Sequence, residues 1–274
     1  MIVHKKNDKL WKPMKSDCSK CSGLCCTALF FSKTDGFPKD KIAGEPCMHL
    51  LKNYQCKIHS QLKAKKMRGC IGYDCFGAGN QVTEIVYKRK TWNELPKQSK
   101  EIFDVFTAVF QLYQIRYFLT EASLLIFADS FSGDIQKLIE ENVRITNNSP
   151  QIILSFNIEE YRSKANDVLK EICKRLHGKE NRKDFSCPKD FIGKKFRGKD
   201  MSGLDLSTKL LIAADFSDCI FDGTIFLGAD TRDTNFTGAD LEEAVFLTQG
   251  QINAAKGNRS TKIPKHLYYP VTWR

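Results

Sequence analysis

The stretch FIGKKFRGKDMSGLDLSTKLLIAADFSDCIFDGTIFLGADTRDTNFTGADLEEAVFLTQG, residues 191–250, repeats with a period of five residues. Divided into blocks of five from Phe191, it begins eleven of its twelve blocks with Phe, Leu or Met, and Thr231 is the exception. Neither a helix, with a period of 3.6, nor a simple strand, with a period of 2.0, produces this spacing. A fixed internal repeat therefore predicts a solenoid whose core is filled by one repeated position.

Two further positions repeat within these blocks. A small residue lies two positions before the large one in the later blocks, at Ala214, Cys219, Thr224, Ala229, Thr234, Ala239 and Ala244. The position between them is often Asp or Asn, at Asp200, Asp205, Asp215, Asp230, Asn235 and Asp240. The pattern resembles the pentapeptide repeat family, A-(D/N)-L-X-X. The resemblance implies a right-handed quadrilateral β-helix with four pentapeptides per coil, in which the large and small residues point inward and Asp or Asn points outward.

Twelve blocks would form about three coils, stacked at the roughly 4.8 Å spacing of paired strands. The expected core ladder consists of Phe216, Phe221, Phe226, Phe236, Leu241 and Phe246. In the early blocks, however, Lys194, Lys199, Leu204 and Lys209 occupy the small inward position. Because a lysine cannot be buried without a partner, we expect the first coil to be distorted or to have a different register.

Residues 96–180 show helical periodicity instead. Ser99 can cap a helix whose apolar stripe begins at Ile102, and a second helix follows Gly133. Asn157 with Glu160 three positions later indicates the start of a third helix, which Gly178 should end. Cys173 lies beside the stripe of this third helix and is interpreted as a small core residue.

The sequence thus predicts a multidomain α+β chain. We expect a metal-stabilised cysteine-rich head at residues 1–95, a helical segment at 96–180, the β-helix at 185–250, and a C-terminal capping tail at 251–274. The tail, which includes HLYYPVTWR, should pack against the open end of the coils or against the helices.

The head contains eight of the eleven cysteines of the chain. They are Cys18, Cys21, Cys25, Cys26, Cys47, Cys56, Cys70 and Cys75. Four of them fall within DCSKCSGLCC, residues 17–26, where tight spacing lets one turn present several thiolates to a common centre. Four soft ligands suit a tetrahedral zinc ion, and four cysteines also hold an iron–sulfur cluster. The eight cysteines are therefore predicted to be metal ligands.

The spacing leaves the metal and the number of sites open. Two four-ligand sites would use all eight cysteines, and His49 or His59 could replace one or two of them. Adjacent Cys25 and Cys26 point in different directions in extended backbone, so they can serve different sites, or only one of them can be a ligand. Structural zinc is favoured over iron or a [4Fe–4S] cluster because no electron-transfer partner or substrate cleft is indicated.

The segments CSKCSGLCC, EPCMHL, CKIH and RGCIGYDCFGAG resemble the bacterial CxxCxxxCC cluster proteins, which are described as zinc- or iron-chelating domains. Related cysteine clusters occur in flagellin lysine methylases. The order of head, helices and repeats is similar to a bacterial class of cysteine-clustered pentapeptide proteins. This resemblance implies a metal rather than a particular reaction.

Charge is distributed unevenly along the chain. Residues 1–95 contain 18 Lys and Arg and 8 Asp and Glu. Residues 200–243, in contrast, contain two Lys and Arg and ten Asp and Glu. The basic runs at 63–68 and 87–90 are candidate nucleic-acid contacts. The first residues lack the apolar run of a signal peptide, and no segment is apolar enough to span a membrane, so we expect a cytoplasmic protein with reduced thiols.

Three functions are consistent with these features. The favoured one is a metal-binding interaction or regulatory protein, with zinc in the head and a protein partner, built on the repeat scaffold. The alternatives are an iron- or iron–sulfur-dependent redox or modifying enzyme, and a DNA mimic that modulates gyrase-type targets. His49, His59, Tyr73 and Asp74 lie among the cysteines, but their spacing identifies no catalytic set.

Overall fold

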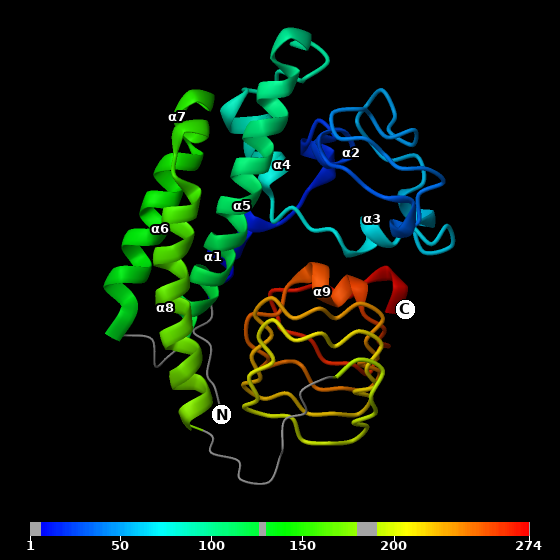
Figure 1. Cartoon of the computed structure of the whole chain (residues 1–274), viewed down its shortest axis with the longest axis vertical. Helices are drawn as coiled ribbons and strands as arrows, with labels where there is room; N and C mark the ends of the chain where they lie inside the picture. The colour runs from blue at the N-terminus through cyan, green and yellow to red at the C-terminus, as the bar shows by residue number, and fades with distance from the viewer. Residues whose placement is uncertain (1–6, 126–129, 180–190, 274) are drawn as a thin grey trace.

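The computed structural model describes residues 7–125, 130–179 and 191–273. The predicted domain boundaries at residues 180 and 185 lie outside the described residues, as does most of the polar linker between them. None of the helices in the described ranges is long and apolar enough to cross a membrane. Figure 1 shows three parts: a layer of helices, the cysteine-rich head beside it, and a stack of coils beneath the head.

The helical layer is built around α5, Ser99–Leu124, the longest helix described in the chain. It packs against α6, Ser132–Thr146, α7, Pro150–Ser155, and α8, Ile158–Lys179 (Figure 1). The predicted helices are therefore present, and α7 is an additional one that begins at Pro150, where a missing N–H costs nothing. Buried side chains of α5, α6 and α8, with Cys173 among them, form one continuous core.

The predicted helix ends are correct only in part. The side chain of Asn157 accepts a hydrogen bond from the backbone N–H of Glu160 at 3.1 Å, as expected for a cap. Ser99 is instead the first residue of α5, and its hydroxyl donates to the Pro96 carbonyl at 3.0 Å. The helix expected to stop at Gly178 continues to Lys179.

The repeat segment forms coils whose positions are aligned every 20 residues. Isolated parallel bridges join Lys195 to Asp215, Asp200 to Ile220, Asp205 to Ile225, Leu210 to Asp230, Asp215 to Asn235, Ile220 to Asp240 and Ile225 to Val245. One coil therefore contains four five-residue blocks, and the same register extends into the first coil. The expected change of register there is wrong. Lys194 and Lys199 are exposed, so neither lysine has to be buried.

The predicted α+β fold with a C-terminal quadrilateral β-helix is nevertheless wrong. Within residues 7–125, 130–179 and 191–273 there are only isolated bridges, with no β-strand, sheet or barrel, and most regular structure is helical. The reason lies in the turns. In ten consecutive blocks, from Gly193 to Gly238, the third residue has a φ between 56° and 71°. This is the geometry of a type II turn. Since each block turns the chain, only one residue per block is left to pair.

The inward residues form the expected aromatic core. The rings of Phe196 and Phe216 are stacked at 5.0 Å, and those of Phe216 and Phe236 at 6.0 Å, both with an interplanar angle of 14°. Cys219 is buried in the same core, and its thiol donates to the Phe196 carbonyl at 3.1 Å. Phe246 departs from the ladder. Its ring packs outward against Phe118 of α5, with 6.1 Å between ring centroids.

One side of the coils docks on the helical layer. Ile225 and Val245 lie 20 residues apart at the bridging position, and both are buried in the core formed by α5, α6 and α8. Ile220, at the same position of the preceding block, faces away and is half exposed. The helices therefore cover one face of the coils and leave the Ile220 face open.

The C-terminal residues close the last coil. After the repeats, α9, Gln249–Ala254, packs against α3 of the head, Arg68–Gly72. Trp273 is buried in the repeat core, where its indole N–H donates to the Ala255 carbonyl at 3.1 Å. His266 stacks on Trp11 at 4.1 Å. The expected packing of the tail on the coils is thus present, and the tail also contacts the N-terminal helix.

Candidate metal centres in the cysteine-rich head

The head is made of short elements that bring distant cysteines together. Its helices are α1, Asp8–Trp11, α2, Leu24–Ala28, α3, Arg68–Gly72, and α4, Ala78–Asn80, which continues as a π-helix over Gln81–Val86. Short 3-10 turns cover Lys12–Met14, Cys18–Lys20, Lys33–Asp35 and His59–Gln61. With so little regular structure, the position of each cysteine depends on specific side-chain contacts.

The first group of cysteines surrounds α4. The backbone N–H of Asp17 donates to the Asn80 side chain at 3.0 Å, and the Asn80 amide donates back to the Asp17 carbonyl at 2.7 Å. This pair places Cys18 beside α4. A side chain added at Gly79 would lie 2.6 Å from the sulfur of Cys21 and 3.9 Å from that of Cys75. The two sulfurs therefore lie near Gly79, where a larger residue would displace the sulfur of Cys21.

Packing separates six of the eight cysteines into two sets. Cys21, Cys25 and Cys75 pack against the core that contains Leu24, Phe76 and the start of α5. Cys47, Cys56 and Cys70 pack against a small separate core formed by Phe37, Ile58 and Met67. The head thus has two apolar centres, each with three cysteines at its edge.

Cys26 joins the second set through the backbone. The N–H of Cys47 donates to the Cys26 carbonyl at 2.9 Å, and Leu50 pairs with Cys56 in an antiparallel bridge. The sulfurs of Cys25 and Cys26, on adjacent residues of α2, are 4.0 Å apart, with Cys25 as the donor. This hydrogen bond raises the pKa of Cys25 and lowers that of Cys26.

Backbone amides are directed at the sulfurs of four cysteines. Burial raises the pKa of Cys21 to about 11, but hydrogen bonds from Leu24 and Gly23 oppose that shift. Burial also raises the pKa of Cys75, Cys47 and Cys56, and each shift is opposed by N–H groups two to four residues later in the chain. Amides directed at sulfur favour the charged form, which is the form that binds metal.

A buried lysine lies in the second set. Lys41 is only 8% exposed, and its ammonium donates to the carbonyls of Thr27 at 2.6 Å and Leu29 at 2.5 Å. Burial lowers the pKa of Lys41, whereas the nearby thiolates of Cys26 and Cys47 oppose that shift. Two backbone carbonyls thus satisfy the buried ammonium group beside Cys26 and Cys47.

Comparison with known proteins gives one match to the repeats and one match to nearly the whole chain. The model for pentapeptide repeats matches residues 211–246 in eight copies. That match does not reach the head, so the predicted cysteine-cluster domain is not confirmed by it. "Uncharacterized protein YybG" of Bacillus subtilis (strain 168) is 37% identical over 272 residues, which cover 98% of both chains. The chain belongs to the YybG family. The similarity to YybG includes the head, the helices and the repeats together.

In this member of the YybG family the two histidines lie outside the cores of the head. His59 is exposed at the start of the 3-10 turn His59–Gln61. His49 is partly buried. Its backbone N–H, and not its imidazole ring, donates a hydrogen bond to the sulfur of Cys47 at 3.5 Å. Within the described ranges, no three Cys, His, Asp or Glu side chains are close enough together to hold a metal ion. The two sets are therefore defined by packing and charge.

The side chains of Ser16 and Lys41 make hydrogen bonds in the head that the sequence does not indicate. The hydroxyl of Ser16 donates to the Asp74 carboxylate at 2.7 Å and lies 3.1 Å from the sulfur of Cys75. Asp74 also accepts the N–H of Phe76 at 3.0 Å. Asp74 is thereby occupied as a structural acceptor beside Cys75. No pattern in the sequence points to these pairs, because Ser16 and Asp74 are 58 residues apart.

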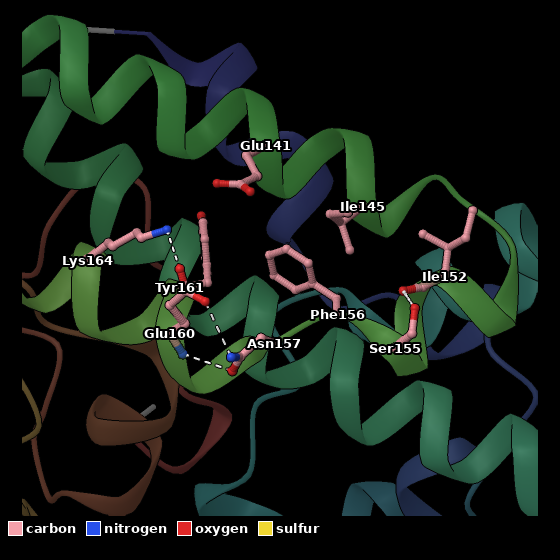
Figure 2. Close-up of a pocket in the computed structure, with 9 residues that line it drawn as sticks. All are labelled: Glu141, Ile145, Ile152, Ser155, Phe156, Asn157, Glu160, Tyr161 and Lys164. Atoms are coloured by element: carbon pink, nitrogen blue, oxygen red, sulfur yellow. Dashed lines mark hydrogen bonds and ion pairs between the residues drawn. The ribbon is translucent and has the colours of Figure 1, made fainter.

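Neither of two cavities outside the cysteine sets contains a catalytic arrangement. A pocket of about 290 Å³ opens between α6, α7 and α8 (Figure 2). Polar side chains that line this pocket already bond to other groups of the chain. Asn157 caps α8, and Glu160 forms an ion pair with Lys164 at 2.7 Å. A cavity of about 20 Å³ between the head, α5 and the tail has room for about one water molecule.

Proposed function

We propose that this YybG-family protein is a metal-binding interaction or regulatory protein. Zinc is held by cysteines of the head, and the pentapeptide repeats form a scaffold that presents the head to a protein partner. The observation that carries the proposal is the density of eight cysteines in the head, six of which lie at the edges of two apolar cores, with backbone amides directed at the sulfur of Cys21. A thiol set of this kind matches the ligands that zinc prefers.

The apolar content of the head supports a structural role for the metal. Within the described residues, the core beside Cys47, Cys56 and Cys70 has only three buried apolar side chains, those of Phe37, Ile58 and Met67. Such a small core provides little stability. A structural zinc ion contributes about 10–16 kcal/mol of apparent binding free energy near neutral pH, which is comparable to the whole stability of a domain.

The charged surfaces favour a protein partner over nucleic acid. In the basic run 63–68, Lys63 donates to the Thr272 carbonyl at 2.7 Å, and in the run 87–90, Arg89 pairs with Glu84 at 3.0 Å. Both runs are thus partly used within the chain. Several acidic residues of the coils are also paired with cations, for example Asp230 with Arg232 and Asp240 with Lys262. A DNA mimic needs unpaired acidic rows, so this observation disfavours that function.

The deciding experiment is elemental analysis of protein purified without oxygen and never exposed to chelators. We expect at least one equivalent of zinc per chain and a colourless sample. Stoichiometric iron with charge-transfer absorption would instead support the iron-dependent enzyme. Less than one equivalent of zinc plus iron, in folded protein with reduced thiols, would overturn the proposal.

A further inference from the structure

We propose that the outer loops of the head form a docking surface for an anionic lipid membrane. The apolar part of this surface, called here the apolar loop surface, consists of Phe30, Ile42, Met48 and Leu51. Such docking places a few apolar side chains in the interfacial layer of a bilayer and needs no membrane-spanning helix. It adds a partner that the proposed function does not include.

The side chains of the apolar loop surface are in contact with solvent although they are large and apolar. Each of the four is between 43% and 69% exposed. Figure 1 shows the loops that carry them, in blue, on the outer side of the head, away from α5 and from the coils. Exposed apolar side chains in one region of a surface are typical of contact sites with other molecules.

Backbone pairing explains why Phe30 and Ile42 point outward. Phe31 and Lys41 form an antiparallel bridge with reciprocal hydrogen bonds of 3.0 and 2.8 Å. Phe31 packs against the small separate core of the head, and Lys41 is buried. Because successive side chains of paired backbone point to opposite sides, Phe30 and Ile42 lie opposite each other on the solvent side of this bridge.

The loop that follows the bridge protrudes in a fixed shape. The N–H of Gly44 donates to the Thr27 carbonyl at 2.9 Å. The N–H of Cys47 donates to the Cys26 carbonyl at 2.9 Å. Residues 42–46 are all exposed, and a side chain added at Gly44 would meet nothing within 4 Å. Since the loop is already ordered, binding through it costs little conformational entropy.

Lysines flank the apolar loop surface on both sides. Lys33 and Lys39 are exposed in the loop closed by the Phe31–Lys41 bridge. Lys52 and Lys57 are exposed in the loop closed by the Leu50–Cys56 bridge. Within the part of the chain that the structure describes, none of these four lysines takes part in an ion pair. Their charge is therefore available to a partner.

The acidic residues of this region offset little of that charge. Residues 29–66 contain eight lysines and three acidic residues. Asp35 and Asp40 accept the backbone N–H groups of Ser32 and Lys33, at 2.9 and 2.8 Å, and Glu45 is exposed. Lysines beside exposed apolar side chains match a bilayer that contains anionic lipids, because the lysines attract the headgroups while the apolar groups enter the interface.

Shape and charge favour lipid over two other partners. A second copy docked through the same surface would bring two basic regions together, and like charges repel. An acidic protein would have to supply a concave site for a protruding loop. A bilayer instead offers negative charge over its whole area to any loop that protrudes.

Co-sedimentation of the full-length protein with lipid vesicles tests the proposal. The vesicles contain either equal parts of phosphatidylcholine and phosphatidylglycerol, or phosphatidylcholine alone. We expect binding to the mixed vesicles, little binding to the neutral ones, and weaker binding as salt is raised. No binding to the mixed vesicles, or equal binding to both kinds, would overturn the proposal.

Ile42→Ser and Ile220→Ser form a matched pair, because the two side chains are 50% and 49% exposed. Ile42→Ser should weaken vesicle binding by about tenfold, since an apolar anchor is lost. Ile220→Ser, on the open face of the coils, should leave binding unchanged. Both positions are exposed, so neither substitution should unfold the chain. Equal binding by the two variants would show that the apolar loop surface does not enter the bilayer.

A soluble copolymer of glutamate and tyrosine separates lipid from an acidic protein as the partner. Attraction of this polymer to the lysines should not change with Ile42→Ser. If the protein fails to bind vesicles but binds the polymer in a way that Ile42→Ser abolishes, the partner is an acidic protein and the lipid proposal is wrong.

Discussion

The carboxyl group of Glu121 accepts the backbone N–H of Phe246 at 2.8 Å, and this contact joins α5 to the end of the repeats. Glu121 is fully buried, and its second oxygen has no hydrogen-bond partner among the described residues. Burial raises the pKa of Glu121 to about 8. At neutral pH the joint between helices and coils therefore contains an uncharged carboxylic acid.

This buried acid predicts that stability decreases as pH rises from about 4.5 toward 8. In that range the folded chain keeps the proton of Glu121, whose folded pKa is about 8, and the unfolded chain releases it. The stabilisation is fully present below the unfolded pKa and is lost as pH rises through the folded one. The slope is at most about 1.4 kcal/mol per pH unit. Denaturant unfolding at several pH values measures it.

Glu121→Gln is the matched variant for this prediction. Glutamine keeps the acceptor for Phe246 but has no proton to release, so its unfolding free energy should vary less with pH. At pH 8 it should be more stable than the unmodified protein. An unchanged pH slope in this variant would show that other groups cause the dependence.

A second prediction compares two isoleucines at the same repeat position. Ile225 is 0% exposed against the helices, whereas Ile220 is 49% exposed on the open face. Ile225→Ala should reduce the free energy of unfolding by about 2–5 kcal/mol because it leaves a cavity. Ile220→Ala should change it by less than about 0.5 kcal/mol. Equal effects of the two substitutions in denaturant unfolding would contradict the docking of this face.

The tail gives a third prediction. Trp273 is 4% exposed and fills the end of the repeat core, whereas Val271 is 78% exposed. Trp273→Ala should cost about 3–5 kcal/mol of stability, and Val271→Ala should be nearly neutral. Thermal unfolding of both variants, followed by circular dichroism, measures the difference. If the Trp273→Ala variant has the same melting temperature as the unmodified protein, a capping role for Trp273 is ruled out.

A fourth prediction concerns removal of metal. Chelation should unfold the region around Phe37, Ile58 and Met67 first, because its apolar core is small. Limited proteolysis followed by mass spectrometry should then show new cleavage between residues 29 and 72, while the Phe216–Phe236 core remains resistant. Cleavage that appears equally in both parts would indicate that the head and coils unfold together.

Repetition made the coils and their core predictable from sequence. The period of five places Phe216, Phe226 and Phe236 inside, and the structure agrees. The turns were also visible, because glycine recurs at the third position of the blocks, and these turns leave too few paired residues for strands. The docking face could not be found in the same way, because Ile220 is apolar at the same block position as Ile225 and Val245 but is 49% exposed.

The candidate site was predictable in composition but not in arrangement. The eight cysteines are evident from their density, whereas their division into two sets depends on contacts between distant residues. Asp17 with Asn80 and Lys41 with Thr27 are pairs of this kind. Such contacts produce no local period, so only the folded chain reveals them.

The alignment of equivalent positions every 20 residues limits how the length of this chain can change. Insertion of a single block between Ile225 and Val245 would rotate every later block by a quarter turn about the axis of the coils. Val245 would then face solvent, and Phe246 would leave Glu121. Insertion of a complete coil would return each side chain to its original direction, although it would lengthen the stack. The repeat number is therefore constrained to steps of four blocks wherever the helices hold the coils.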